Sequence, residues 1–393
     1  MLKKKLIFLI IVLALFLCPF TARAAEQQKD SKLSWSEVSS KVDLQQMEKF
    51  KEQVDQEMRG YLGDKSTSQW VSDFVKGKWQ FNFSDLLGSL FRYLVGEVAA
   101  NGRLMGKILV LAVVSALLVN MQSSFESQGA AKMAGMACFL ALSAIALGSF
   151  KSVLQAGSNT VGNLSDFMAS ILPQMMILVT GLGHVHTAAA MFPLLMVAST
   201  AFAKGISTII IPLIIFSAVL HLIDCLSDTV KVERMAKLVY TLVEILLVLF
   251  MSVFVILLGL RTLYGSVLDA ITLKTGKIVA DVVFPVIGGN LGEALEIAAG
   301  YVVLLKHAVG ILGMLIILGM FILPVLKIGA VMIIYKVSAA IIEPMGDART
   351  SKALDIMGNH LGLVMATVAG AGLMFLILMA IVGSIGNSVI LVR

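Results

Sequence analysis

Three side chains at helical spacing could support acid–base or metal chemistry. His221, Asp224 and Cys225 occupy positions i, i+3 and i+4 of an apolar segment, so a helix would place them on one face. Ionisable groups inside membrane segments often move protons or ions, and a proton or metal role is therefore one interpretation. The interpretation that we favour is simpler: the helix reaches the membrane interface here, and these groups meet water.

Two other polar features stand in apolar surroundings. Glu244 lies inside a strongly apolar run and is the ionisable residue that we most expect to face a partner helix or a cavity. Residues 343–349 follow another apolar run, and a proline and a glycine among them predict a turn. This turn is either solvated or has a docking or conformational role, and three of its residues could form ion pairs with one another: Glu343, Asp347 and Arg349.

None of the motifs that mark common enzyme classes is present in the sequence. It has no His-Glu-x-x-His zinc motif, no Walker loop and no nucleophile elbow. Cys138 and Cys225 lie in apolar runs, with neither metal-ligand spacing nor the pattern of a disulfide framework. We therefore expect no enzyme, no catalytic residues, no cofactor and no metal. An ATPase that drove this protein would be a separate chain.

Composition defines the elements that must position these residues. The chain has 393 residues, of which 58% are hydrophobic and 14% are charged, and its mean hydropathy is +0.91. A soluble chain is close to half apolar and about one quarter charged. The apolar excess is concentrated in blocks after residue 103, as expected of segments that cross a bilayer. The sequence therefore predicts a helical membrane protein.

Residues 1–24 have the three parts of a cleavable signal peptide. Lysines at positions 3–5 form its charged region, residues 6–17 form its apolar core, and Ala22-Arg23-Ala24 provides the small residues of a cleavage site. The alternative is an uncleaved first span, and in both cases the following segment starts on the outer side of the membrane. Since this segment contributes four of the basic residues behind the net charge of +6, we see no basis for nucleic-acid binding.

Residues 25–102 are predicted to be an extracytoplasmic amphipathic helical region. Apolar residues recur at steps of three and four between Leu44 and Met58, and Gly60 follows as a natural helix end. A second stripe, from Leu86 to Val98, suits a helix that lies on the membrane surface or one that packs on its own small core. Because so few residues bury little surface alone, we expect this region to lean on the membrane, on the bundle or on a partner.

Residues 103–393 are predicted to be an all-α, polytopic transmembrane helix bundle. Because the signal peptide places the start of the mature chain outside, the loop at 227–237 falls inside, and its Lys231, Arg234 and Lys237 fit the positive-inside bias. We expect about seven to nine spans among these segments: 104–121, 133–150, 167–183, 187–203, 206–226, 238–260, 302–326, 328–342 and 361–390.

Prolines and small residues mark irregular or close helix packing. Small residues recur in the last span, where they allow neighbouring helix backbones to approach closely. Five prolines lie in sequence of membrane depth, and each removes a helix hydrogen bond. One of them introduces Pro285-Val286-Ile287-Gly288-Gly289-Asn290, which is typical of the tip of a broken or re-entrant helix. We expect helix kinks or breaks at Pro173, Pro193, Pro212, Pro285 and Pro324.

The arrangement of a signal peptide, a short outer helical region and a long polytopic remainder resembles the stage III sporulation protein AE family of endospore-forming bacteria. The segment from Ile211-Pro212-Leu213 through Asp228 and the segment Glu343-Pro344-Met345-Gly346-Asp347-Ala348-Arg349 resemble stretches of that family. The resemblance extends over essentially the whole chain. It supplies no catalytic residues.

This resemblance implies a multi-pass protein of the mother-cell membrane around the forespore. Its expected partners are the other stage III sporulation A-operon membrane proteins, with stage II sporulation protein Q reached indirectly across the intermembrane space. The assembly resembles a secretion or feeding channel that sustains late forespore gene expression and development. The lipid bilayer is a further partner, and nucleic acid is not.

Three functions remain open from the sequence. The favoured one is a structural or channel subunit of that assembly. The second is a self-sufficient transporter permease for an unknown small solute, which the predicted broken helices favour. The third, and the least favoured, is a membrane-embedded enzyme that uses His221 and Asp224.

Overall fold

A computed structural model describes residues 45–58, 66–75, 83–121, 128–182, 184–226, 231–256 and 288–385. Almost all of these residues lie in helices, and this part of the chain contains no strand. The predicted all-α class and the bundle of membrane helices are confirmed. The predicted signal peptide and Pro285 lie outside the described residues.

The first described helices form two linked pairs. They are α3 (Gln45–Met58), α4 (Thr67–Val75), α5 (Phe83–Ala100) and α6 (Gly102–Met121). The Thr67 backbone N–H donates to Glu48 Oε2 at 2.5 Å, which ties the start of α4 to α3. At the end of α5, Asn101 Nδ2 donates to the carbonyl of Glu97 at 2.9 Å. The chain then bends by 46° between α5 and α6.

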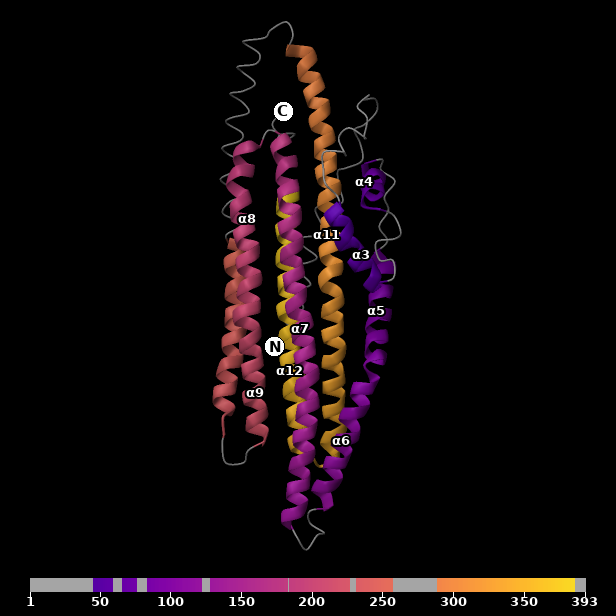
Figure 1. Ribbon diagram of the computed structural model, residues 1–393, viewed down its shortest axis with the longest axis vertical. Helices are drawn as coiled ribbons and strands as arrows, with labels where there is room; N and C mark the ends of the chain where they lie inside the picture. The colour runs from indigo at the N-terminus through magenta and orange to yellow at the C-terminus, as the bar shows by residue number, and fades with distance from the viewer. Residues whose placement is uncertain are drawn as a thin grey trace.

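Long helices make up the rest of the bundle. They are α7 (Gln128–Gly181), α8 (Val185–Gly205), α9 (Ile211–Leu226), an unlabelled helix at Glu233–Ile256, α11 (Gly288–Ile342) and α12 (Ala348–Ser384). Figure 1 shows them side by side along the long axis, with α7, α11 and α12 central, α8 and α9 on one side, and α5 and α6 on the other.

The centre of the core is the contact between α7 and the hairpin of α11 and α12. The hairpin turns through a short 3-10 helix at Glu343–Met345, after which Gly346 adopts a φ of 92°, a conformation that favours glycine. Tyr335 of α11 is fully buried, and its hydroxyl lies 3.0 Å from the carbonyl of Ala146 in α7. At Gly157, a Cβ atom would lie 3.0 Å from Val368 Cγ2, so this glycine lets α7 approach α12 closely.

The N-terminal helices lean on this bundle. The rings of Phe50 in α3 and Phe167 in α7 meet edge to face, with centroids 5.2 Å apart. The Nζ atom of Lys327 in α11 lies 4.0 Å from Glu97 Oε1 in α5. Helices α3, α4 and α5 therefore lie along α11 rather than forming a separate unit.

Five helices in the described residues are long and apolar enough to cross a membrane, and a sixth is added if the bent pair of α5 and α6 counts as one span. This number is below the predicted seven to nine because three pairs of predicted spans are each continuous: 133–150 with 167–183, 187–203 with 206–226, and 302–326 with 328–342. Most of the polar residues that separate the first pair lie on an outward face of α7, and none of them ends the helix. With 54 residues, α7 is about 80 Å long, well beyond the roughly 30 Å of a hydrocarbon core.

Most of the described prolines are accommodated without a break in the helix. Helices α7, α8 and α11 continue through Pro173, Pro193 and Pro324, so none of the three ends its helix, and kinks at these positions stay a prediction. Pro212 differs, because a π-helical turn at Ile206–Ile210 comes directly before it. The wider turn makes room for the proline ring, at the place where proline cannot donate a helix hydrogen bond. The chain therefore continues from α8 into α9.

Candidate functional site

A buried polar cluster lies where α9, α12 and the helix at Glu233–Ile256 meet. The ring centroids of His221 in α9 and His360 in α12 are 5.1 Å apart, and the Tyr240 ring lies 5.2 Å from that of His360. His360 is 1% exposed and His221 is 7% exposed. The structure thus places one predicted site residue, His221, against a second histidine that is distant in the sequence.

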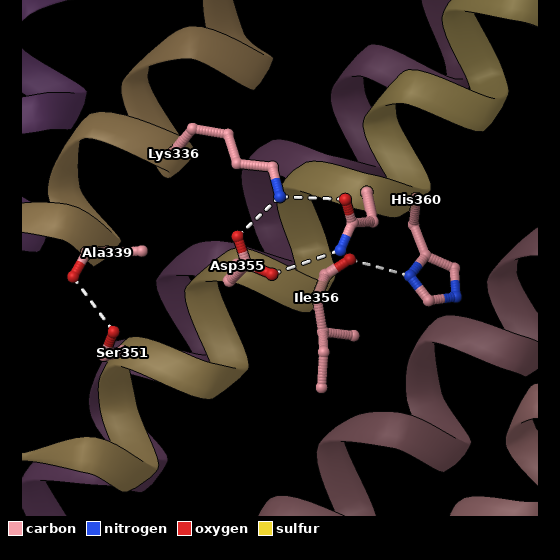
Figure 2. A network of polar contacts seen from close by, with 7 residues as sticks. Lys336, Ala339, Ser351, Asp355, Ile356 and His360 are labelled. Atoms are coloured by element: carbon pink, nitrogen blue, oxygen red, sulfur yellow. Dashed lines mark hydrogen bonds and ion pairs between the residues drawn. The ribbon is translucent and has the colours of Figure 1, made fainter. Parts of the chain in front are cut away.

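Hydrogen bonds define the roles within this cluster. Figure 2 shows the contact between His360 Nδ1 and the carbonyl of Ile356, which are 2.8 Å apart. Because a carbonyl only accepts, His360 Nδ1 is the donor. In a neutral ring His360 Nε2 is then an acceptor, and Ser217 Oγ lies 3.0 Å from it. His221 Nδ1 likewise donates to the Ser217 carbonyl at 2.9 Å. Ser217 Oγ is also 3.1 Å from the carbonyl of Ala236, which is a second acceptor for its single proton, so the hydroxyl of this α9 serine lies between α12 and the helix at Glu233–Ile256.

The chemistry open to this cluster is limited by its enclosure. A serine oxygen 3.0 Å from an imidazole nitrogen has the spacing of a nucleophile and its base. However, Ser217 is 0% exposed, and the group that orients His360 is a backbone carbonyl rather than a carboxylate. The arrangement therefore suits a buried hydrogen-bond network that holds three helices in register.

Asp224 acts as a cap for the next helix. Its Oδ1 accepts hydrogen bonds from the backbone N–H groups of Val232 and Glu233, each at 3.1 Å, where the helix at Glu233–Ile256 begins. Its Oδ2 lies 3.6 Å from Lys352 Nζ of α12. A carboxylate at a helix N-terminus satisfies free N–H groups and complements the helix dipole. Asp224 therefore joins the ends of three helices.

The other two sequence candidates in this region are Cys225 and Glu244. Cys225 is a buried, free thiol next to Asp224. Within the described ranges, no three His, Cys, Asp or Glu side chains gather as metal ligands do. Glu244 is half-buried one turn after Tyr240, and so continues the helix face that Tyr240 turns toward His360.

A second polar network joins α11 to α12, as Figure 2 shows, and its Lys336 and Asp355 side chains are 37% and 51% exposed. Lys336 Nζ lies 2.5 Å from Asp355 Oδ1 and 2.8 Å from Asn359 Oδ1. Asn359 Nδ2 in turn donates to Asp355 Oδ2 at 3.2 Å. Each member of this triad contacts both of the others, so its charge is neutralised locally where the hairpin meets its surroundings.

In the predicted polar turn at residues 343–349, Asp347 makes the hydrogen bonds that hold the turn in place. This residue is 3% exposed, and its Oδ1 accepts the backbone N–H of Thr350 at 3.0 Å as the N-cap of α12. Its Oδ2 accepts the hydroxyl of Ser115 in α6 at 2.5 Å. Glu343 is exposed and Arg349 is half-buried. Asp347 therefore joins the hairpin turn to α6.

Sequence reasoning missed His360, Ser217 and the triad of Lys336, Asp355 and Asn359. Asp355 and Asn359 stand four residues apart just before a predicted span, a spacing that would have indicated a shared polar helix face. The pairing of His360 with α9 had no such signal, because it depends on which helices are neighbours.

Comparisons with known proteins agree with this architecture. The sequence model for stage III sporulation protein AE matches residues 65–386. A relative from Bacillus subtilis (strain 168), named stage III sporulation protein AE, is 27% identical over 334 residues, which are 85% of this chain and 84% of the relative. No solved structure matches the chain.

Proposed function

Because the chain belongs to the stage III sporulation protein AE family, we propose that it is a membrane subunit of a channel or secretion-like complex that links mother cell and forespore. The observation that carries the proposal is the extent of the family match, which includes every candidate membrane helix of the described chain. The sporulation family and the several apolar helices together favour a role within a membrane. The proposal assigns the chain no catalytic step, since its best nucleophile–base pair is enclosed.

The proposed location is the mother-cell membrane around the forespore, with the outer side facing the intermembrane space. The partners that we propose are the other stage III sporulation A-operon membrane proteins and, indirectly, stage II sporulation protein Q. We propose residues 1–24 as a signal peptide, 25–102 as the outer region and 103–393 as the membrane domain. Helices α3, α4 and α5 are the described part of that outer region.

Charge supports the orientation of the bundle. Asp224 lies 3.6 Å from Lys352, so the end of α9 and the hairpin turn between α11 and α12 are at the same end of the molecule. Lys231, Arg234 and Lys237 are close by in the chain, where the helix at Glu233–Ile256 begins. Basic residues accumulate on the cytoplasmic side of membrane proteins. We therefore propose that this end faces the mother-cell cytoplasm.

A deletion strain tests the function. Removal of the gene is expected to allow engulfment and then to abolish a late forespore-specific reporter, and the wild-type chain supplied in trans is expected to restore it. The proposal fails if the deletion strain expresses the reporter and forms spores at the wild-type rate. A matched control supplies the chain with Phe91→Leu, a change at an exposed apolar site of α5, and is expected to restore the reporter.

Two observations favour a second function, a self-sufficient permease. Buried histidines at membrane depth and a π-helical turn before Pro212 are features that transporters use at their substrate sites. The two functions separate in a vesicle assay. A permease would take up solute when it is the one protein in the vesicles, whereas a complex subunit would be silent without its partners.

A further inference from the structure

The middle of α7 carries a row of exposed polar side chains. Successive members are one to four residues apart, so the row follows one face of the helix for about 22 Å. The other face of the same segment is in the core, with Val161 and Leu164 fully buried. We call this row the polar stripe, and it consists of Lys151, Ser152, Gln155, Asn159, Asn163 and Asp166.

Contacts between helices fix the start of the stripe along the bundle axis. Phe150, next to the stripe, meets His360 of α12 edge to face with centroids 6.5 Å apart, and His360 in turn meets Tyr240. The start of the stripe is therefore level with Tyr240 of the helix at Glu233–Ile256.

A second set of contacts fixes the level further along the stripe. A Cβ at Gly157 would be 3.0 Å from Val368, and one at Gly370 would be 3.0 Å from Met251. Both contacts lie near the same part of α12. The stripe thus runs level with the segment from Tyr240 to about Ile256.

That neighbouring helix defines a lipid-facing side at the same depth. Its exposed apolar residues extend from Met235 to Ile256, which is about 30 Å and matches the thickness of a hydrocarbon core. Its largest exposed apolar side chains include Leu238, Ile245, Val248 and Ile256, each more than half exposed. One side of the bundle is therefore apolar at the depth where another side, on α7, is polar.

Contact between the polar stripe and lipid hydrocarbon would be energetically unfavourable. Lys151 and Asp166 are charged, and the amides of Gln155, Asn159 and Asn163 have hydrogen-bonding groups that lipid does not satisfy. Gln155 Nε2 donates to Asn159 Oδ1 at 3.1 Å, and both residues are exposed. The stripe therefore needs water or a polar partner at the level of the bilayer.

We propose that the polar stripe lines a water-filled conduit, which further copies of this chain close around a common axis. One helix face is too narrow to enclose water, whereas a closed ring of identical subunits presents the same face repeatedly to its axis. The stripe has one cation and one anion near its two ends and only uncharged residues between them. The conduit therefore suits hydrated solutes without strong selection by charge. The inference rests on the channel role proposed above, and it names the surface that would carry that role.

Cysteine labelling in membranes of sporulating cells tests this inference. In a chain with Cys18, Cys138 and Cys225 replaced by alanine, single cysteines are introduced on the stripe at Ser152→Cys and Asn159→Cys. The matched control on the apolar side is Val248→Cys, which lies at the same depth. Ser152→Cys replaces one oxygen by sulfur, so this variant is the least disturbing to folding, and only variants that accumulate in the membrane are labelled.

The expected result is a labelling rate at the two stripe cysteines at least ten times that at Val248→Cys with a charged, membrane-impermeant thiol reagent. The reason is that the thiolate is the reactive species and forms in water but not in lipid. A flexible bis-maleimide is then expected to link stripe cysteines of separate copies into dimers and larger species. Equal, slow labelling at all three sites would show that the stripe is dry, and equal, fast labelling would show that this level is outside the bilayer. Either result overturns the inference.

Fast labelling without links between copies would overturn closure of the conduit by this chain. Failure of the proposed function looks different, because it appears as normal reporter expression in the deletion strain whatever the labelling shows. A wet stripe in a strain that does not need the protein for sporulation would thus refute the function and leave the conduit standing.

Discussion

Replacement of Gly372 by alanine tests how closely α11 and α12 pack. Gly372 of α12 faces the ring of Phe321 in α11, and a Cβ atom there would overlap three ring atoms, of which the farthest, Cδ2, would be 2.6 Å away. Carbon atoms in contact are normally about 3.5–4.0 Å apart. Phe321 is 5% exposed, so its ring has little free space to move into. The two backbones must separate or the ring must leave its preferred rotamer.

Two opposing effects determine the size of the change. Overpacking a core costs about 1–3 kcal/mol, and alanine in place of glycine inside a helix returns up to about 1 kcal/mol. Gly372→Ala is therefore expected to destabilise the protein by about 0–3 kcal/mol. Gly383 in the same helix is the matched control, because nothing lies within 4 Å of a Cβ at that position. Gly383→Ala is expected to be neutral or slightly stabilising, so the two variants should differ by about 1–3 kcal/mol.

The assay is thermal unfolding of the detergent-solubilised protein, followed by the fraction that remains monodisperse. Gly372→Ala is expected to lose its monodisperse peak several degrees below Gly383→Ala. A double variant with Phe321→Leu relieves the overlap, so the two single changes at this contact should couple by about 1 kcal/mol or more. Identical unfolding of the two alanine variants, together with strict additivity at Gly372 and Phe321, would refute the close approach described for this hairpin.

Three further predictions use the same unfolding assay. Asp224→Ala is expected to destabilise the protein by about 1–3 kcal/mol, because two N–H groups at a helix start lose their acceptor, and Asp224→Asn, which keeps one oxygen, should lose less. Asp347→Ala removes the cap of α12, and we expect a loss of about 1–2 kcal/mol, whereas an unchanged midpoint would show that the cap contributes nothing. Lys336→Ala breaks an exposed pair with Asp355 and is expected to change stability by less than about 1 kcal/mol; a larger loss would mean that this triad is buried against lipid or a partner.

The sequence identified the fold class because hydropathy is a local property. Blocks of apolar residues are sufficient to predict membrane helices, and each described candidate span overlaps a predicted one. The number of spans was harder to predict from the sequence, because a polar segment between apolar blocks resembles a loop. Lys151 and Asp166 lie in such a segment, and the structure shows that it continues α7 with an apolar inner face. Whether such a segment turns or continues depends on the neighbours that cover that face.

The candidate site could be predicted only in part from the sequence, for the same reason. His221 and Asp224 could be singled out, since they are polar residues in an apolar run. Their partners could not, because His360 and Lys352 are more than 120 positions away and meet them through helix packing. The role of Asp224 as a cap also required the position of the next helix, which begins at Glu233. Spacing predicts a shared face within one helix, while contacts between helices require the fold.

Affinity capture of the tagged chain from detergent-solubilised membranes of sporulating cells tests the central claim most directly. A subunit of a mother-cell channel should bring the other stage III sporulation A-operon membrane proteins with it in fixed ratios, and should do so only after engulfment begins. Recovery of this chain alone, under conditions where a known membrane complex of the same cells stays intact, would contradict the account.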